Sequence, residues 1–202
     1  MPKADTRLAA ALAAIDAANA CDPNTIEVNG RREPNELVYG RRMSETLGRM
    51  APDASEHLHI AARGQHIERW TSPRKSYPDG RAGYLAWRNA LKAYHAQRLG
   101  EIMAAAGYGS DDVARVGSLV RKERLKLDAE AQALEDVVCV VFLEHYIGGF
   151  MAKTGDDKLA GILAKTWNKM SERGHQHALK LNLPSSIPRL LEQGLTKIQR
   201  SS

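Results

Sequence analysis

The sequence has few aromatic residues, two cysteines and no long apolar segment. Cys21 and Cys139 are far apart and show no metal-binding spacing, so we expect both thiols to be reduced, as in the cytoplasm. No apolar run reaches the roughly 18 residues that a membrane-spanning helix needs. Arg7 and Asp16 interrupt the Ala-rich N-terminal stretch, which argues against a signal peptide. We therefore expect a cytoplasmic protein that does not act on membranes.

The overall composition is that of a globular protein with a modest excess of positive charge. Hydrophobic residues make up 43% of the 202 residues, charged residues 26%, and the net charge is +5. This length favours a single domain over residues 1–202. The positive charge permits an anionic partner, such as a phosphorylated metabolite, a nucleotide or a nucleic acid. It equally fits a protein that is simply somewhat basic.

The sequence has no segment of strand periodicity, and its apolar residues recur at helical spacing. The pattern predicts an all-α, compact helical bundle of seven to nine helices. We expect helices over residues 4–20, 34–50, 55–70, 81–106, 111–124, 129–151, 158–173 and 187–199. Polar loops are expected over 22–33 and 71–80, and Ser55 (or Asp53) and Asp128 are expected to cap the helices that follow them.

One stretch, Ala61–Arg98, has a composition that folding alone does not require. Its 38 residues hold six arginines, two tryptophans, three tyrosines and two histidines, and five of the eleven aromatic residues of the chain lie between Trp70 and Tyr94. Arginine and tryptophan side chains are costly to order, and guanidinium groups pair with anions or aromatic rings. The stretch therefore predicts a binding site.

Helical spacing sharpens this prediction. Two sets of residues share a helix face at these spacings: His66, Arg69 and Trp70 on one helix, and Tyr84, Arg88, Leu91 and His95 on the next. If the second stripe faces inward, Arg88 is a buried cation and must be paired. Its partner is then either a bound anion or an internal carboxylate such as Asp136, in which case His95 is an ordinary core histidine.

Carboxylates occur in the most apolar predicted helix, 129–151. Glu135 and Asp136 open its apolar run, and one of them should point inward. A buried carboxylate needs a cation, a metal ion or hydrogen-bond donors. Asp136 is the better candidate, and Glu123 in the preceding charged segment is a second carboxylate within reach of a site.

The order of these pieces resembles the histidine–aspartate (HD) domain phosphohydrolase superfamily over about residues 33–146, with the C-terminal helices 155–200 packed on that core. The matching positions are Tyr39, the run Ala61 to His66, Tyr94-His95-Ala96, Lys122-Glu123 and Leu134-Glu135-Asp136. The resemblance implies an all-α fold, a divalent metal ion and phosphoester hydrolysis. Tyr39, Gln65 and His66 depart from the usual ligands, and Asp136 alone is unchanged. A metal ion, if bound, would have His66, His95 and Asp136 as ligands.

A second resemblance covers most of the chain. The runs from Gln65 to Ala96 and from Val120 to Tyr146 are similar to an uncharacterised bacterial family, domain of unknown function 4202. This resemblance implies an HD-like all-α domain and brings no established activity.

Two classes of function follow from these residues. The first is an enzyme, a hydrolase of the phosphoester type, acting on a phosphorylated or other anionic small molecule such as a nucleotide. Its catalytic residues would be His66, His95, Asp136 and Glu123. Its substrate would be bound by Gln65, Arg69, Trp70, Arg74, Tyr77, Tyr84, Trp87, Arg88 and Lys122.

The second class is a catalytically inactive HD-like module that binds a small molecule, a protein or RNA. The loss of the usual metal ligands motivates it. RNA binding is disfavoured, because the regular stripe from Tyr84 to His95 suits an inward-facing pocket better than an open surface. The sequence leaves the oligomeric state open, including a homo-oligomer.

Overall fold

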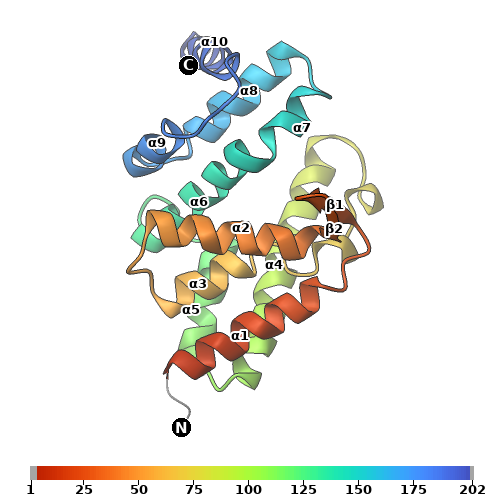
Figure 1. Cartoon of the computed structure of the whole chain (residues 1–202), viewed down its shortest axis with the longest axis vertical. Helices are drawn as coiled ribbons and strands as arrows, with labels where there is room; N and C mark the ends of the chain where they lie inside the picture. The colour runs from red at the N-terminus through yellow and green to blue at the C-terminus, as the bar shows by residue number, and fades with distance from the viewer. Residues whose placement is uncertain (1–3, 201–202) are drawn as a thin grey trace. The chain divides into compact units, whose positions relative to one another are not determined.

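The computed structural model describes residues 4–200, and it is mostly helical, as the sequence predicts (Figure 1). The longer helices are α1 (Ala4–Asn19), α2 (Asn35–Met50), α3 (Glu56–Arg63), α4 (Gly80–Ala105), α5 (Ser110–Arg121), α6 (Ala129–His145), α8 (Asp156–Trp167) and α10 (Ile187–Gln199). The shorter elements are α7 (Ile147–Met151), α9 (Glu172–Ala178), the 3₁₀ helices η1 (Arg69–Thr71) and η2 (Arg74–Ser76), and the strands β1 (Thr25–Val28) and β2 (Arg31–Pro34).

Several predicted helix ends agree with the structure because the capping side chains act locally. The Ser55 hydroxyl accepts a hydrogen bond from the backbone N–H of Leu58 and begins α3. Asp128 accepts hydrogen bonds from the backbone N–H groups of Glu130 and Ala131 and begins α6. The bounds of α10 are those predicted. These caps are confirmed because each depends on residues within one helical turn.

The number of helices is a correction. Within the described part of the chain there are ten α-helices, against the seven to nine predicted. The predicted helix 129–151 is interrupted at Tyr146, which has φ −121° and separates α6 from α7. The predicted helix 158–173 ends at Trp167, and α9 starts afresh after its cap, Ser171.

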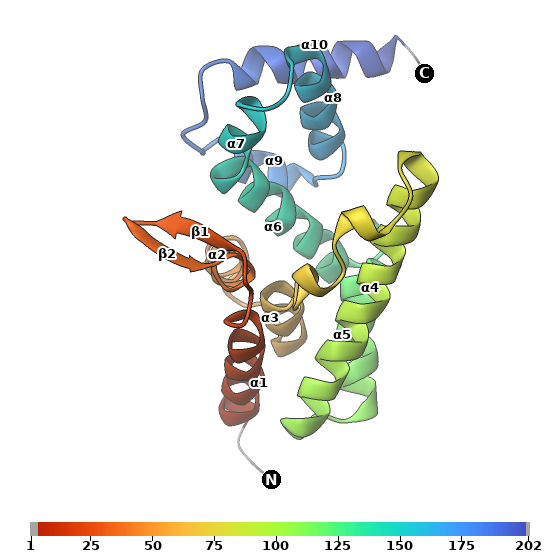
Figure 2. The ribbon, with the colours of Figure 1, turned by 90° about the vertical axis from the view of Figure 1, so that its right-hand side faces the viewer.

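The predicted loop 22–33 is also corrected, because most of it forms a two-stranded antiparallel hairpin, seen beside α2 in Figure 2. Val28 pairs with Arg31 across the two-residue turn Asn29-Gly30. Both turn residues have positive φ, 51° and 76°, which is the backbone geometry favoured in two-residue hairpins. The Asn-Gly turn signal was therefore a hairpin signal, and β1 alternates polar and apolar residues over its four positions, whereas β2 does not.

The predicted helix 55–70 ends early, at Arg63. Gly64 is its C-cap, and a Cβ atom built on Gly64 would lie 2.3 Å from Cδ2 of Leu99. The turn after α3 therefore lies directly against α4, and Glu68 adopts a left-handed conformation with φ 49°. Consequently His66, Arg69 and Trp70 do not share a helix face.

The chain divides into two units, one ending at Ala131 and the other beginning at Gln132, so the boundary falls in the first turn of α6. In the first unit α4 packs on α5, and α3 packs against α1, α2 and α5. Buried side chains from these helices, including Ile15, Met43, Leu47, Ile60 and Leu99, form its core. The prediction of one domain with an HD-like core remains a prediction.

In the second unit α8 packs on α10 through a close helix contact. Gly194 of α10 lies so near α8 that a Cβ atom there would be 2.1 Å from the carbonyl oxygen of Ala160. Leu159, Leu163 and Leu190 are buried around this contact. None of the helices described in the structure is long and apolar enough to cross a bilayer.

We predict that a glycine-to-alanine substitution has opposite effects on the free energy of unfolding in α10 and in α8. Gly194→Ala should lower the free energy of unfolding by about 1–3 kcal/mol, because the added methyl group overlaps the backbone of α8. Gly161→Ala on α8 meets nothing within 4 Å, and it should raise the free energy of unfolding by about 0.5–1 kcal/mol through helix propensity. Urea unfolding measures both, and equal stability of the two variants would contradict the packing.

Candidate functional site

A buried imidazole, His66, forms the centre of the candidate site in the first unit. Its ring stacks on Tyr39 of α2 with centroids 4.0 Å apart and planes 12° apart. Nη1 of Arg69 lies 2.9 Å from Nε2 and 3.3 Å from Nδ1 of the ring. Oε2 of Glu36 lies 3.4 Å from Nδ1. Groups from α2 and from the turn after α3 therefore hold the ring in place.

These neighbours determine the protonation state of His66. Burial, followed by the positive charges of Arg69, Arg88 and Lys122, holds its pKa well below the usual range. The ring is therefore neutral near pH 7. Because a guanidinium can donate hydrogen bonds but not accept them, Nε2 is the accepting nitrogen and the ring proton is on Nδ1, next to Glu36.

Glu36 is a site residue that the sequence did not reveal. It lies in the first turn of α2, where an acidic residue is ordinary, but its side chain is buried. Its backbone N–H donates to the Asp22 carboxylate at 3.0 Å, and Oε1 accepts from the side chain of Asn35. Burial, with a smaller contribution from Asp22, raises the pKa of Glu36 to about 7 against the lowering effects of Arg69 and Asn35. No periodicity or motif marks this position.

His95 of α4 provides a second buried imidazole, with ring centroid 6.2 Å from that of His66. Burial lowers its pKa to about 3, and His66, Arg69 and Arg88 lower it as well, while a hydrogen bond to the backbone of Gln65 raises it. Nε2 of His95 is buried and has no hydrogen-bond partner in the described structure. The site therefore contains two neutral imidazoles close to several fixed cations.

Two of those cations, Arg69 and Arg88, form no salt bridge with any carboxylate of the described residues. Arg69 contacts His66 and lies over the ring of Trp87, with its Cζ 5.1 Å from the ring centroid. Trp87 is held by a 2.8 Å hydrogen bond from Nε1 to the carbonyl oxygen of Ser72. Among residues 4–200, neither Arg69 nor Arg88 makes a salt bridge. Lys122, at the left-handed C-terminal cap of α5, adds a third cation.

The structure brings together part of the predicted substrate-binding set and leaves the rest in the connecting loop. Arg69 contacts His66 and lies over Trp87, the backbone of Gln65 bonds to His95, and the charges of Arg88 and Lys122 act on His66. Arg74 instead donates to the carbonyl oxygens of Tyr77 and Gly80, which closes the loop before α4. The stripe on α4 is not inward-facing throughout, because Tyr84 is 46% exposed, 5.9 Å from Trp87. Trp70 follows Arg69 in η1 and is half-buried.

The two predicted catalytic carboxylates have other partners. Glu123 is exposed and pairs with Arg121 at 2.6 Å. Asp136 belongs to the second unit, where both it and Glu135 are buried. Its carboxylate accepts hydrogen bonds from the backbone N–H and hydroxyl of Ser171 and from Gln132. These bonds connect α6 to the start of α9 and account for its burial, while a catalytic role for either carboxylate remains a prediction.

The residues around His66 do not fit the divalent metal ion that the HD resemblance implies. No group of three or more His, Cys, Asp or Glu side chains in the described structure is arranged to hold a metal ion. The guanidinium of Arg69 lies 2.9 Å from Nε2, where a metal ion would have to bind. Arg88 and Lys122 add positive charge that repels a second cation. The cluster is therefore suited to anions.

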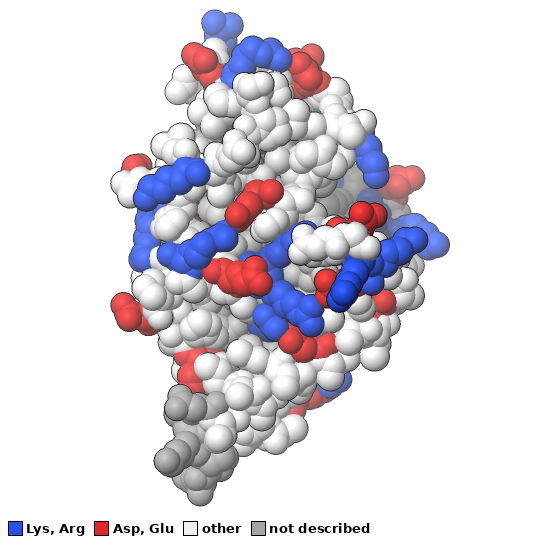
Figure 3. All heavy atoms as spheres, viewed as in Figure 1, with Lys and Arg blue, Asp and Glu red and all other residues white. Residues whose placement is uncertain are grey.

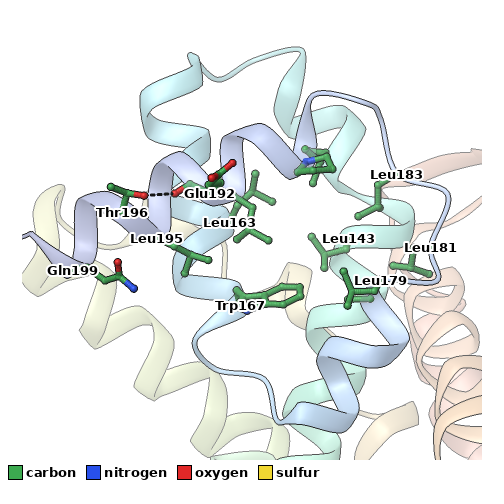
Figure 4. Close-up of a pocket in the computed structure, with 14 residues that line it drawn as sticks. Leu143, Leu163, Trp167, Leu179, Leu181, Leu183, Glu192, Leu195, Thr196 and Gln199 are labelled. Carbon is green, nitrogen blue, oxygen red and sulfur yellow. Dashed lines mark hydrogen bonds between the residues drawn. The ribbon is translucent and has the colours of Figure 1, made fainter.

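A cavity of about 550 Å³ lies in the second unit, between α6, α8, α10 and the segment after α9 (Figure 4). Leucines and Trp167 form most of its wall, and Glu192, Thr196 and Gln199 are its polar residues. Size alone would favour it as a ligand site. Its lining has no imidazole, lysine or arginine, so it lacks the cations that anion binding requires, and Glu192 is its one titratable group.

Surface charge bears on the kind of partner. On the face shown in Figure 3, lysine and arginine side chains are interspersed with aspartate and glutamate. A protein that follows a nucleic-acid backbone needs an extended basic surface, and this face does not provide one. The positive charge of Arg69, Arg88 and Lys122 is concentrated near His66.

Comparison with known proteins identifies a family. A family model described as "Domain of unknown function (DUF4202)" matches residues 9–191. A search of curated proteins and a search of solved structures each found no match.

Glu36 predicts a specific dependence of stability on pH. Its pKa is about 7 when folded and about 4.5 when unfolded, so between these values the folded state keeps a proton that the unfolded state has lost. This group therefore makes the free energy of unfolding decrease as pH rises from about 4.5 to 7. In Glu36→Gln that loss is absent. The stability of the variant relative to wild type should increase by about 3 kcal/mol across this window.

Urea unfolding at a series of pH values measures this difference. The lowered pKa values of His66 and His95 change stability in the opposite direction, but they are common to both proteins and largely cancel. Glu45→Gln, an exposed position on the same helix, is the control and should stay within about 0.5 kcal/mol of wild type throughout. A difference between Glu36→Gln and wild type that does not change with pH would contradict the buried, protonated carboxyl group.

Proposed function

The chain belongs to the family described as domain of unknown function 4202, and we propose that it binds a phosphorylated or similarly anionic small molecule at the cluster around His66, on an HD-like helical fold. The observation that carries the proposal is the pair of guanidinium groups, Arg69 and Arg88. Both lie close enough to lower the pKa of the buried imidazoles, and neither has a carboxylate partner among the described residues.

Electrostatics supports an anionic ligand at this place. Two guanidinium groups near each other repel, and the neutral imidazoles beside them do not offset their charge. A phosphate group would accept forked hydrogen bonds from both arginines and neutralise the charge that now lowers the pKa of His66. Trp87, already in contact with Arg69, provides an apolar wall for the organic part of the ligand.

A second candidate function, hydrolysis of a phosphoester without a metal ion, is favoured by the contact between His66 and Glu36. Once a bound phosphate takes over the hydrogen bond that Arg69 gives to Nε2 and offsets the arginine charges, the pKa of His66 rises and Nε2 can accept a proton from water. The water oxygen then bonds to phosphorus as the ester oxygen leaves and takes a proton from solvent, while the carboxyl group of Glu36 lies 3.4 Å from Nδ1. Without such chemistry, the same cluster is that of a non-catalytic binding module.

We predict that anion binding depends on both arginines. Arg69→Gln and Arg88→Gln should each weaken binding by about 10- to 100-fold, because each removes a charge-assisted hydrogen bond worth about 1.5–3 kcal/mol. Binding is measured by titration calorimetry with inorganic phosphate and a panel of nucleotides and sugar phosphates. Arg81→Gln, at an exposed position of the same helix α4, is the matched control and should bind as wild type does. Equal binding by all four proteins would refute this site.

We further predict that binding needs no metal ion. Protein treated with a chelator should keep its thermal shift with the same ligand, which amounts to about 2.7 kcal/mol of stability at 100 times the Kd. Elemental analysis should find less than one metal ion per chain. A stoichiometric metal ion whose removal abolishes binding would overturn the proposal. Turnover of the bound phosphoester by the chelated protein identifies the hydrolase, and binding without turnover identifies the non-catalytic module.

A further inference from the structure

Three buried polar atoms around His66 lack hydrogen bonds. They are Oε2 of Glu36, Oε1 of Gln65 and Nε2 of His95. The three residues are 8%, 7% and 4% exposed, so the missing partners are not supplied by bulk solvent. An unpaired buried polar group costs about 1–3 kcal/mol. Three such groups in one place indicate that something absent from the free chain pairs with them.

The three atoms belong to one neighbourhood, and it is the one that contains the arginines. The charge of Arg69 acts on Glu36, His66 and His95 alike, and Arg88 acts on both histidines. Gln65 precedes His66 in the chain and bonds to His95 through its backbone. The geometry agrees, because Arg69 and Glu36 lie 2.9 Å and 3.4 Å from the ring nitrogens of His66, and the His95 ring centroid is 6.2 Å from that of His66. A ligand that reaches Arg69 therefore comes close to Glu36 and His95.

The chemistry of the atoms shows what they require. The neutral His95 ring uses its other nitrogen to donate to the backbone carbonyl of Gln65, so Nε2 has a free lone pair and accepts. The amide oxygen of Gln65 accepts as well. A phosphate group has acceptor oxygens, so it satisfies the arginines and leaves both of these acceptors unpaired. Hydrogen-bond donors must come from another part of the ligand.

Resting on the proposed function, we infer that the ligand is a phosphate ester whose organic part carries hydroxyl groups, as a sugar phosphate does. The phosphate binds Arg69 and Arg88, and the hydroxyls donate to Oε1 of Gln65 and Nε2 of His95. Gln65 and His95 thereby determine specificity, because they distinguish a hydroxylated ester from an apolar one of similar size. An apolar ester leaves the same acceptors unpaired when it binds.

A matched pair of ligands tests this inference. Ribose 5-phosphate and n-pentyl phosphate share the phosphate group and five carbon atoms, and they differ in the hydroxyl groups. Titration calorimetry with wild-type protein should show that ribose 5-phosphate binds about tenfold more tightly or better. Adenosine 5′-monophosphate is the third probe. If this nucleotide binds more tightly than ribose 5-phosphate, the natural ligand is a ribonucleotide. If it binds equally or more weakly, the natural ligand is a free sugar phosphate.

Variants connect the preference to particular atoms. Gln65→Met keeps the length of the side chain but removes one of the two acceptors, and it should reduce the ratio of the two affinities severalfold. His95→Phe removes the acceptor Nε2 and should also reduce this ratio. It provides a second measurement if Gln65→Met does not fold. Gln97→Met, the same substitution at an exposed position of α4, should keep the wild-type ratio.

The outcomes separate this inference from the proposed function. If both esters bind equally to wild type, and both need Arg69, the hydroxyl preference is refuted while anion binding stands. If neither ester, nor inorganic phosphate, nor the nucleotide binds, the anion site itself is refuted. If both Gln65→Met and His95→Phe keep the full preference for ribose 5-phosphate, other groups bind its hydroxyls, and the inference is overturned.

Discussion

The site depends on the close contact between the turn after α3 and the helix α4. Gly64 lies against Leu99 with no room for a Cβ atom, and this contact ends α3 one turn before His66. Because the helix stops there, the chain turns back and places His66 near His95 of α4 and near Tyr39 and Glu36 of α2. Had the helix continued to Trp70, these groups would project in directions set by helical spacing and would not converge.

Arg69 and Arg88 differ from several other arginines of the first unit, which form salt bridges. Arg63 pairs with Asp16, Arg98 with Glu68 and Glu101, and Arg115 with Asp128 and Glu130. Arg63 connects α3 to α1, Arg98 connects α4 to Glu68 in the turn after α3, and Arg115 connects α5 to the start of α6, so those arginines have a structural explanation. Arg69 and Arg88 have no such partner in the described chain, although Glu36 lies close enough for its pKa to respond to Arg69. Structural need therefore does not account for these two arginines.

The sequence predicted the features that depend on neighbouring residues and missed those that depend on contacts between elements. Capping by Ser55 and Asp128 involves one helical turn, and both caps were predicted. The early end of α3 depends on the contact of Gly64 with Leu99, which lies 35 positions further along the chain. No pattern in the neighbouring sequence predicts this contact. Glu36 was missed for the same reason: an acidic residue in a first turn is common on helix surfaces, and its burial comes from tertiary packing.

The same burial that raises the pKa of Glu36 explains why a cationic site can exist beside it without a carboxylate counter-ion. A fully ionised Glu36 would pair with Arg69 and compete with an incoming anion. With a pKa of about 7, its carboxyl group is roughly half protonated at neutral pH and competes less. The arginines therefore stay available for an anion. In exchange, the protein buries the carboxyl group of Glu36, which destabilises the fold. A selected binding function explains such a cost, because a core under no functional constraint would replace these polar groups with apolar side chains of similar volume.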